Sequence, residues 1–311
     1  MEYYYLKIGT GNAQARDWLA GKNPLAVPAA VIWFDPRSLE EYEAGKGDLE
    51  PRTFWNRGKD EFREQTMMVV VHEGEVWILK PAQPVRFLPA DGANTNTRKA
   101  MPVTVLAHRS AKDVPLVLAS ITANQYYTRG TFRRINNKKN KDWGNCKAID
   151  CVAGGPLEGE HWAIEKQQAA QLLECLSSVE LETLVAKLLE ARGCFVPAYR
   201  GGGMKDIDLF AHNDSGQPVC IDHLVIQPHE RVSLQIKRWS KGMTKPASVD
   251  YLIGLDVKGE NAFNANWLMQ RIQESSNVMN WFCRSLAWLP ADFLNKTIAR
   301  LKEKQTALAV G

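Results

Sequence analysis

The sequence changes character at residues 153–156, where Ala-Gly-Gly-Pro would interrupt any regular secondary structure. Before this point, short apolar or alternating runs predict strands, and after it longer runs with helical periodicity appear. A chain of 311 residues is also longer than most single hydrophobic cores. We therefore expect two domains, over residues 1–152 and 157–311.

The first domain is expected to be rich in β-strands. Strand patterns occur at residues 3–8, 29–34, 66–71, 75–79, 85–88, 102–107 and 114–121. Helices are expected only at residues 12–20 and 58–64, and His72-Glu73-Gly74 predicts the turn of a hairpin. Several short strands with little helix indicate a small barrel.

The second domain combines helices and strands. Leu181, Leu184, Val185 and Leu188 recur at the spacing of one helical face, and Gly193 follows where such a helix would end. Helices are predicted at residues 161–177, 180–192, 266–286 and 291–308, and strands at 194–199, 207–211, 219–226, 232–237 and 251–254. This order predicts an α/β layer with a mixed sheet, so the fold class expected for the whole chain is α+β.

The composition is that of an ordinary soluble protein, with 45% hydrophobic and 24% charged residues. No apolar run approaches the roughly 20 residues that cross a bilayer, and the N-terminal residues do not have the pattern of a signal peptide. We expect a cytoplasmic protein with no membrane partner. The six cysteines form no C-x-x-C pair, which favours reduced thiols over a structural zinc site.

Polar side chains alternate with apolar ones in two predicted strands. One segment reads Asp-Ile-Asp-Leu from Asp206, and the other reads Val-Ser-Leu-Gln-Ile-Lys up to Lys237. Alternate side chains of a strand share a face, so Asp206 is expected beside Asp208, and Gln235 beside Lys237. If the two strands pair, carboxylate, amide and ammonium groups converge on one patch.

Such a patch suits phosphodiester hydrolysis. A carboxylate and a carbonyl oxygen bind a hard cation such as Mg²⁺, with Mn²⁺ as a substitute, and the metal polarises the phosphate and activates a bound water. Lys237 can orient that water and stabilise charge on the phosphate. The alternative interpretation makes Lys237 a solvated residue at a strand end and Asp208 a turn residue.

The residues that carry this pattern resemble a known family. Glu182 in its helix, the turn Gly201-Gly202-Gly203, Ile207-Asp208-Leu209 and Gln235-Ile236-Lys237 resemble the Mrr-type branch of the PD-(D/E)xK nucleases over about residues 178–257. The resemblance implies that Asp208 is the principal metal ligand, Gln235 a further metal ligand and Lys237 the catalytic lysine. It also implies that Glu182 is an accessory metal ligand from the helix.

Two departures from the family pattern leave alternatives open. Lys205-Asp206 stands where the family has small residues, so Asp206 competes with Asp208 for the ligand role. In addition, 26 residues separate Asp208 from Gln235, where a tight hairpin is usual. The extra residues are either an inserted strand or a segment that brings Asp222 to the site.

A basic segment near the end of the first domain predicts contact with DNA. Between Arg129 and Lys147 the chain has seven lysines and arginines and one acid, Asp142. Such an excess binds phosphates by releasing counterions, and aromatic residues interleaved with arginines add stacking. The candidate DNA-binding residues are Arg129, Arg133, Arg134, Lys138, Lys139 and Lys141. The alternative is a solvated basic loop.

The first domain also carries a fainter resemblance. Residues 67–71 through 77–79 resemble the hairpin of EVE and other PUA-like barrels, some of which recognise modified bases in restriction systems. Aromatic residues such as Trp33 and Trp55 either stack a flipped base or fill the core of the barrel.

Together these patterns favour a restriction or phage-defence DNA endonuclease. A PUA-like domain would sense DNA, including modified DNA, and an Mrr-like domain would cut it. The family resemblance implies a homodimer, because two strands need two active sites. Two alternatives remain: a nuclease effector that a small nucleotide switches on, and a non-catalytic nucleic-acid-binding protein.

Overall fold

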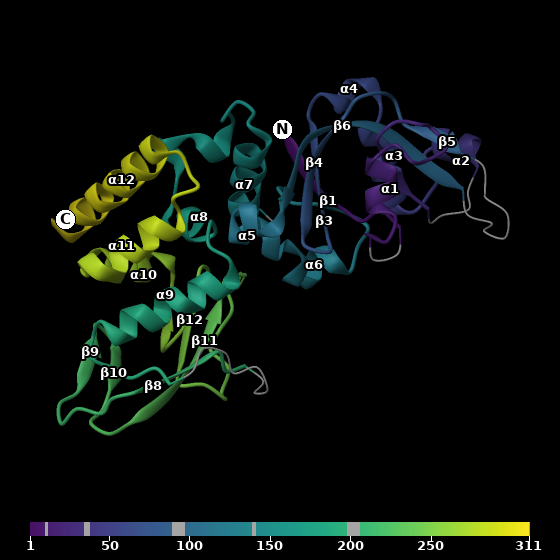
Figure 1. Ribbon diagram of the computed structural model, residues 1–311. Coiled ribbons are helices and arrows are strands. Elements are labelled where there is room, and N and C mark those ends of the chain that lie inside the picture. The colour runs from purple at the N-terminus through teal and green to yellow at the C-terminus, as the bar shows by residue number, and fades with distance from the viewer. Residues whose placement is uncertain are drawn as a thin grey trace. The chain divides into compact units, whose positions relative to one another are not determined.

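The computed structural model describes residues 1–9, 12–33, 38–88, 97–138, 141–197, 206–239 and 241–310. The chain divides into two compact units, Met1–Gly159 and Glu160–Gly311 (Figure 1). The division falls shortly after the Ala-Gly-Gly-Pro segment. There the helix α7 (Trp143–Ala153) ends at Gly154, whose φ of 66° is the left-handed conformation that glycine adopts without strain.

The first unit contains a curled mixed sheet of seven strands (Figure 1). Neighbouring strands follow the order β2-β6-β4-β3-β1-β7, and β5 pairs with β6. The strands are β1 (Glu2–Leu6), β2 (Ala29–Ile32), β3 (Thr66–His72), β4 (Glu75–Pro81), β5 (Arg86–Leu88), β6 (Arg98–Ser110) and β7 (Phe132–Arg134). The first part of β6 pairs with β2 and β5 and the rest with β4, so this long strand joins two parts of the sheet.

Strand β1 lies inside this sheet, parallel to β3 and antiparallel to β7. Its tyrosines, Tyr3, Tyr4 and Tyr5, are each only 1% exposed, so both faces of the strand are covered. The ring of Tyr4 stacks on Phe132 at a centroid distance of 4.3 Å. The hairpin predicted around His72-Glu73-Gly74 is confirmed, because β3 and β4 pair antiparallel up to His72 and Glu75.

The first unit has more helix than its sequence predicted. Its helices are α1 (Ala15–Leu19), α2 (Leu39–Glu43), α3 (Leu49–Arg57), α4 (Asp60–Arg63), α5 (Leu116–Ala119), α6 (Gln125–Thr128) and α7. The strand predicted at residues 114–121 is wrong, since α5 and a 3-10 helix occupy this region. Val117, Leu118 and Ile121 are buried at a helical spacing, and a short apolar run cannot distinguish that spacing from a buried strand.

The second unit is built on a four-stranded sheet in the order β13-β12-β11-β8. Its strands are β8 (Leu209–His212), β11 (Arg231–Lys237), β12 (Tyr251–Gly254) and β13 (Ala262–Phe263). β8 and β11 are antiparallel, whereas β11, β12 and β13 are parallel neighbours. The expected mixed sheet is therefore present, and the chain as a whole has an α+β fold.

The 26 residues between Asp208 and Gln235 include an inserted hairpin. Its strands, β9 (Val219–Ile221) and β10 (Leu224–Ile226), pair only with each other among the described strands. The backbone N–H of His229 donates to the carbonyl of Asn213 at 2.8 Å, which closes the base of the insertion. The hairpin therefore extends the connection without separating β8 from β11.

The helix predicted at residues 180–192 is confirmed as α9 (Ser178–Glu190). Ser177 and Glu180 form a reciprocal capping box at its start, and Gly193, with a φ of 90°, follows its end. Its buried face packs against β8 and β11 (Figure 1). α9 thus covers one face of the strands that carry the candidate site.

The helix predicted at residues 291–308 is confirmed as the last of the remaining helices, whereas the others are shorter than predicted. The remaining helices are α8 (Ala169–Leu173), α10 (Ala265–Gln273), α11 (Ser276–Ser285) and α12 (Ala291–Val310). The region predicted as one helix at residues 161–177 contains two 3-10 turns and α8, and Ser275 caps α11 to divide the predicted helix 266–286. Among the described helices, none is both long enough and apolar enough to span a bilayer.

Candidate active site

The pairing of β8 with β11 determines which side chains share a face. Leu209 lies opposite Leu234 in the ladder, and Phe210 lies opposite Ser233. Residues opposite each other in a ladder point to the same face. Leu209 and Leu234, which are at most 1% exposed, belong to the face that α9 covers, whereas Gln235 belongs to the other face.

Asp208 precedes β8 and is held against β11 by its backbone and its side chain. Its N–H donates to the carbonyl of Leu234 at 2.9 Å, and its Oδ2 accepts the N–H of Ile236 at 2.7 Å. The carboxylate therefore accepts a backbone N–H of β11 that a carbonyl group would accept if β8 continued in the ladder. This arrangement fixes the carboxylate against the backbone of β11.

The same carboxylate oxygen lies 3.4 Å from Nζ of Lys237. The Lys237 side chain is 33% exposed and the Asp208 side chain 22% exposed, so solvent reaches both. Asp208 and Lys237 thus meet as their strand positions predicted. Their partial exposure leaves the pair accessible to a ligand.

Gln235 is the most deeply buried member of this group, at 1% exposure. Its Nε2 donates to Oδ1 of Asp206 at 3.3 Å, whereas its Oε1 is buried without a hydrogen-bond partner. Asp206 has a φ of 71°, a left-handed conformation that aspartate tolerates better than most residues. An unsatisfied buried acceptor is costly and calls for a partner such as a water or a cation.

The other candidate acids occupy different positions. Glu182 is half-buried on α9, which packs against both strands. Asp222 lies at the turn of the β9–β10 hairpin, with a carboxylate oxygen 3.5 Å from Nε2 of His223. The turn Gly201-Gly202-Gly203 lies outside the described residues.

Asp208 and Gln235 offer oxygen atoms of the kind that a hard divalent cation binds. Within the described ranges, no three side chains of His, Cys, Asp or Glu form a cluster that could hold a metal ion. The donors here are instead one carboxylate and one buried amide oxygen. Mg²⁺ typically binds one or two protein oxygens and keeps several waters. Oε1 of Gln235 has no hydrogen-bond partner and can therefore serve as such a ligand.

The basic segment of the first unit is partly neutralised by acids from elsewhere in the chain. Nε of Arg133 lies 2.7 Å from Glu50, whose carboxylate also accepts two backbone N–H groups. Arg134 pairs with Glu2 at 2.9 Å, and Glu2 also pairs with Arg57 at 2.8 Å. These two arginines therefore contribute to the packing of the first unit.

The outward cations of this segment are Arg129, Lys138 and Lys141, all exposed. Nζ of Lys141 lies 5.8 Å from the centre of the Trp143 ring. Lys139 lies outside the described residues. The positive surface is therefore narrower than the charge count of the sequence indicated.

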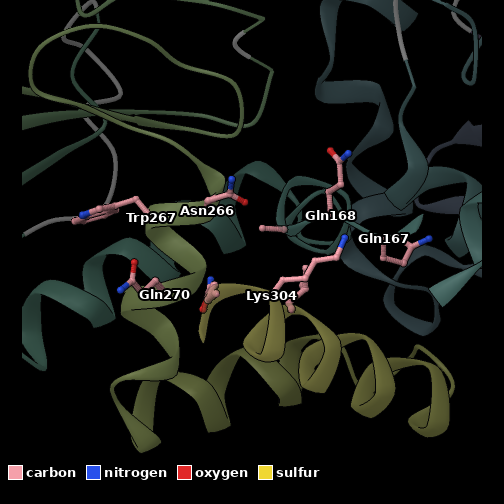
Figure 2. A pocket seen from close by; sticks show the side chains of 9 residues that line it. Gln167, Gln168, Asn266, Trp267, Gln270 and Lys304 are labelled. Carbon is pink, nitrogen blue, oxygen red and sulfur yellow. The ribbon is translucent and has the colours of Figure 1, made fainter. Parts of the chain in front are cut away.

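A separate cavity of about 650 Å³ lies among α8, α10 and α12 (Figure 2). Gln167 and Gln168 lie on one side of Lys304 in this view, and Trp267 and Gln270 lie on the other (Figure 2). Its lining residues are Gln167, Gln168, Ala169, Asn266, Trp267, Gln270, Leu301, Lys304 and Gln305. Among the described residues that line this cavity there is no Asp, Glu, His, Ser or Cys.

Sequence reasoning did not single out Phe195, Phe210 and Arg231, which lie on the same sheet face as Gln235. The guanidinium carbon of Arg231 lies 3.9 Å from the centre of the Phe210 ring. The alternation of side chains along residues 231–237 predicts that Arg231 lies on that face. Its contact with Phe210 could not be predicted without the register between β8 and β11.

No protein-family model, curated protein or solved structure matches the chain. The geometry of the site itself therefore carries the functional argument.

Proposed function

We propose that the chain is a metal-dependent DNA endonuclease whose catalytic group is Asp208, Gln235 and Lys237. The observations that support this most strongly are the pairing of Asp208 with Lys237 and the buried, unpartnered Oε1 of Gln235 on the same strand as Lys237. In this proposal the second unit is a restriction-endonuclease-like domain of the Mrr type. The first unit is a PUA-like domain that senses DNA.

Asp208 and Gln235 would hold a Mg²⁺ ion, and Mn²⁺ suits the same oxygen donors. When bound, such an ion polarises the phosphate and makes a coordinated water more acidic. Lys237 carries a positive charge that stabilises the negative charge that develops on the phosphate. Its ammonium is directed by Oδ2 of Asp208, at 3.4 Å, so the lysine is oriented before substrate arrives.

Two further acids have supporting roles in this proposal. Asp206 is a positioning residue, because it accepts the hydrogen bond from Nε2 of Gln235 and so leaves Oε1 as the ligand atom. Glu182 is an accessory metal ligand from α9, the helix that packs against β8 and β11. Glu182 is half-buried on that helix.

The first unit would bring DNA to this site. Arg129, Lys138 and Lys141 are exposed and available for phosphates, and Lys139 belongs to the same segment. A PUA-like sensor joined to a nuclease domain corresponds to a restriction or phage-defence enzyme, including one that depends on modified bases. Cleavage of both strands would require two active sites and hence a homodimer.

Plasmid cleavage tests this proposal. Purified protein is incubated with modified and unmodified supercoiled plasmid, in Mg²⁺ or in EDTA, beside Lys237→Ala. Lys258→Ala is a matched control, because this exposed lysine follows β12 in the same unit. We expect cutting in Mg²⁺ by the wild type and the control, and no cutting in EDTA or by Lys237→Ala. Equal cutting by Lys237→Ala and the wild type would remove the assignment.

A further inference from the structure

The face of β8 and β11 that α9 leaves uncovered carries more than the candidate catalytic group. Figure 1 shows α9 across one face of the sheet, and α11 packs on α9, so these helices form layers on one side. The ladder places a set of side chains on the other side, which we call the open face. The open face consists of Phe195, Phe210, His212, Arg231, Ser233 and Lys237, and Gln235 lies on the same side of the sheet but is buried.

Phe210 and Arg231 form a stacked pair on the open face. The guanidinium carbon of Arg231 lies 3.9 Å from the centre of the Phe210 ring, and Arg231 itself is exposed. Within the described residues, Arg231 makes no ion pair. A planar guanidinium that rests on a ring presents its other side to solvent, where it can stack on a base and pair with a phosphate.

Phe195 extends this surface at the edge of the sheet. Its N–H donates to the carbonyl of His212 and its carbonyl accepts the N–H of His212, both at 2.8 Å. The backbone of Phe195 is therefore fixed, yet its side chain is 57% exposed. An exposed ring held on a paired backbone offers apolar area to a ligand at little cost in conformational entropy.

Two acids lie beside the open face. Asp214 lies 3.6 Å from Nδ1 of His212, and Asp250 accepts hydrogen bonds from the N–H and hydroxyl of Ser233 at 2.7 and 2.8 Å. Arg231 is an exposed cation at this end of the face. This combination of aromatic rings and a cation suits a ligand that has both flat bases and phosphates.

The stacked pair and the candidate catalytic lysine lie at opposite ends of β11. Arg231 is the first residue of the strand and Lys237 is the last. Six residue steps at about 3.3 Å each give a separation of about 20 Å, the length of a few nucleotides. A strand of nucleic acid lying along β11 can therefore contact both ends at once.

We propose that the open face binds single-stranded nucleic acid, with bases stacked on Phe195 and on the Phe210–Arg231 pair and a phosphate at Lys237. This inference rests on the proposed nuclease function and specifies its substrate. The bases of a duplex are already stacked and paired, so they cannot lie on a sheet surface. Unpaired bases can, and stacking on aromatic side chains tolerates any sequence.

Binding of labelled single-stranded and duplex DNA of one sequence to the full chain, in EDTA so that nothing is cut, tests the proposal. The variants are Phe195→Ser, Arg231→Ala and Phe195→Trp, with Leu157→Ser as a control at an exposed apolar residue of the first unit. The affinity for single-stranded DNA should depend on the open face, whereas the affinity for duplex, which the first unit is proposed to bind, should not. Phe195→Ser and Arg231→Ala should weaken binding of single-stranded DNA about tenfold or more, whereas Phe195→Trp and the control should not.

The proposal is overturned if Phe195→Ser binds single-stranded DNA like the wild type, or if it loses as much affinity for duplex as for single-stranded DNA. A parallel cleavage assay in Mg²⁺ separates this result from the fate of the nuclease assignment. If Phe195→Ser binds single-stranded DNA like the wild type and cleavage is intact, only the stacking surface is rejected. If binding still depends on Phe195 but neither the wild type nor any variant cuts DNA, the nuclease assignment is rejected and the open face remains a binding site.

Discussion

Nζ of Lys237 lies 3.4 Å from Oδ2 of Asp208, although 29 positions separate these residues in the chain. The N–H of Ile236 donates to the same oxygen at 2.7 Å, so the carboxylate is fixed both by the backbone of β11 and by its last side chain. The antiparallel ladder between β8 and β11 produces this pair. The proposed chemistry depends on it.

Gln235→Glu should lower the Mg²⁺ concentration that gives half-maximal cleavage, and Gln235→Leu should raise it. Oε1 of Gln235 is buried and unpartnered, and a carboxylate binds a hard cation more strongly than an amide oxygen does. A Mg²⁺ titration of the cleavage rate measures both shifts, each expected to be about tenfold. Titrations that coincide with the wild type for both variants would show that Gln235 is not a ligand.

Replacing residues 217–227 with a short Gly-Ser turn should preserve cleavage. The hairpin β9–β10 lies outside the four-stranded sheet, and the hydrogen bond from His229 to Asn213 closes its base. The melting temperature should fall, because the deletion removes the buried side chains of Ile221, Leu224 and Ile226 and the bond from the Tyr251 hydroxyl to the carbonyl of Val225. Cleavage and melting measurements check this, and loss of cleavage in a folded deletion variant would give the hairpin a functional role.

Lys138→Ala and Lys141→Ala should weaken DNA binding without changing stability, because both side chains are exposed. Each lost phosphate contact should reduce the slope of log affinity against log salt by about 1. Arg134→Ala should instead lower the urea midpoint, since Arg134 pairs with Glu2 at 2.9 Å. Binding at several salt concentrations and urea unfolding separate these roles. An unchanged salt slope for the double lysine variant would remove this segment from the DNA interface.

The first unit should lose stability in alkaline solution. Burial raises the pKa of Tyr3 far above its usual range, with a further increase from the nearby Asp150, and burial also raises the pKa of Tyr4. A tyrosine with a raised folded pKa stabilises the fold fully below its unfolded pKa of about 10, and this contribution falls as the pH rises above that value.

Urea unfolding at about pH 8 and about pH 11 measures this loss. The midpoint should be lower at the higher pH, and Tyr3→Phe should show a smaller difference between the two. The same variant should lose about 1 kcal/mol at the lower pH, because the Tyr3 hydroxyl bonds to Asp150 at 2.8 and 3.0 Å. A midpoint that does not change with pH would contradict this account.

The second unit was the more predictable part of the sequence. The spacing of Leu181, Leu184 and Leu188 gave α9, and the alternation before Lys237 gave β11 with the correct faces. Both patterns are local, so a single sequence contains them. The meeting of Asp208 with Lys237 also depended on which strands pair, and the family resemblance supplied that expectation.

Other features depend on contacts that are distant in the chain. The parallel pairing of β1 with β3 joins residues more than sixty positions apart, and nothing in residues 2–6 identifies their partner. The helix α5 was predicted as a strand, because Leu116-Val117-Leu118 fits a buried element of either kind. The ion pair of Arg134 with Glu2 likewise appears only in the folded chain, so the charge count overstated the basic surface.

The central claim is that the Asp208 carboxylate takes part in metal-dependent cleavage. Its most direct test is the single-turnover cleavage rate of Asp208→Asn in Mg²⁺, with the melting temperature measured on the same sample. Asparagine keeps an oxygen that accepts the N–H of Ile236 but has no charge for the metal or for Lys237. The account predicts an unchanged melting temperature and a rate lowered about a hundredfold or more. A folded Asp208→Asn protein that cuts at the wild-type rate would contradict it.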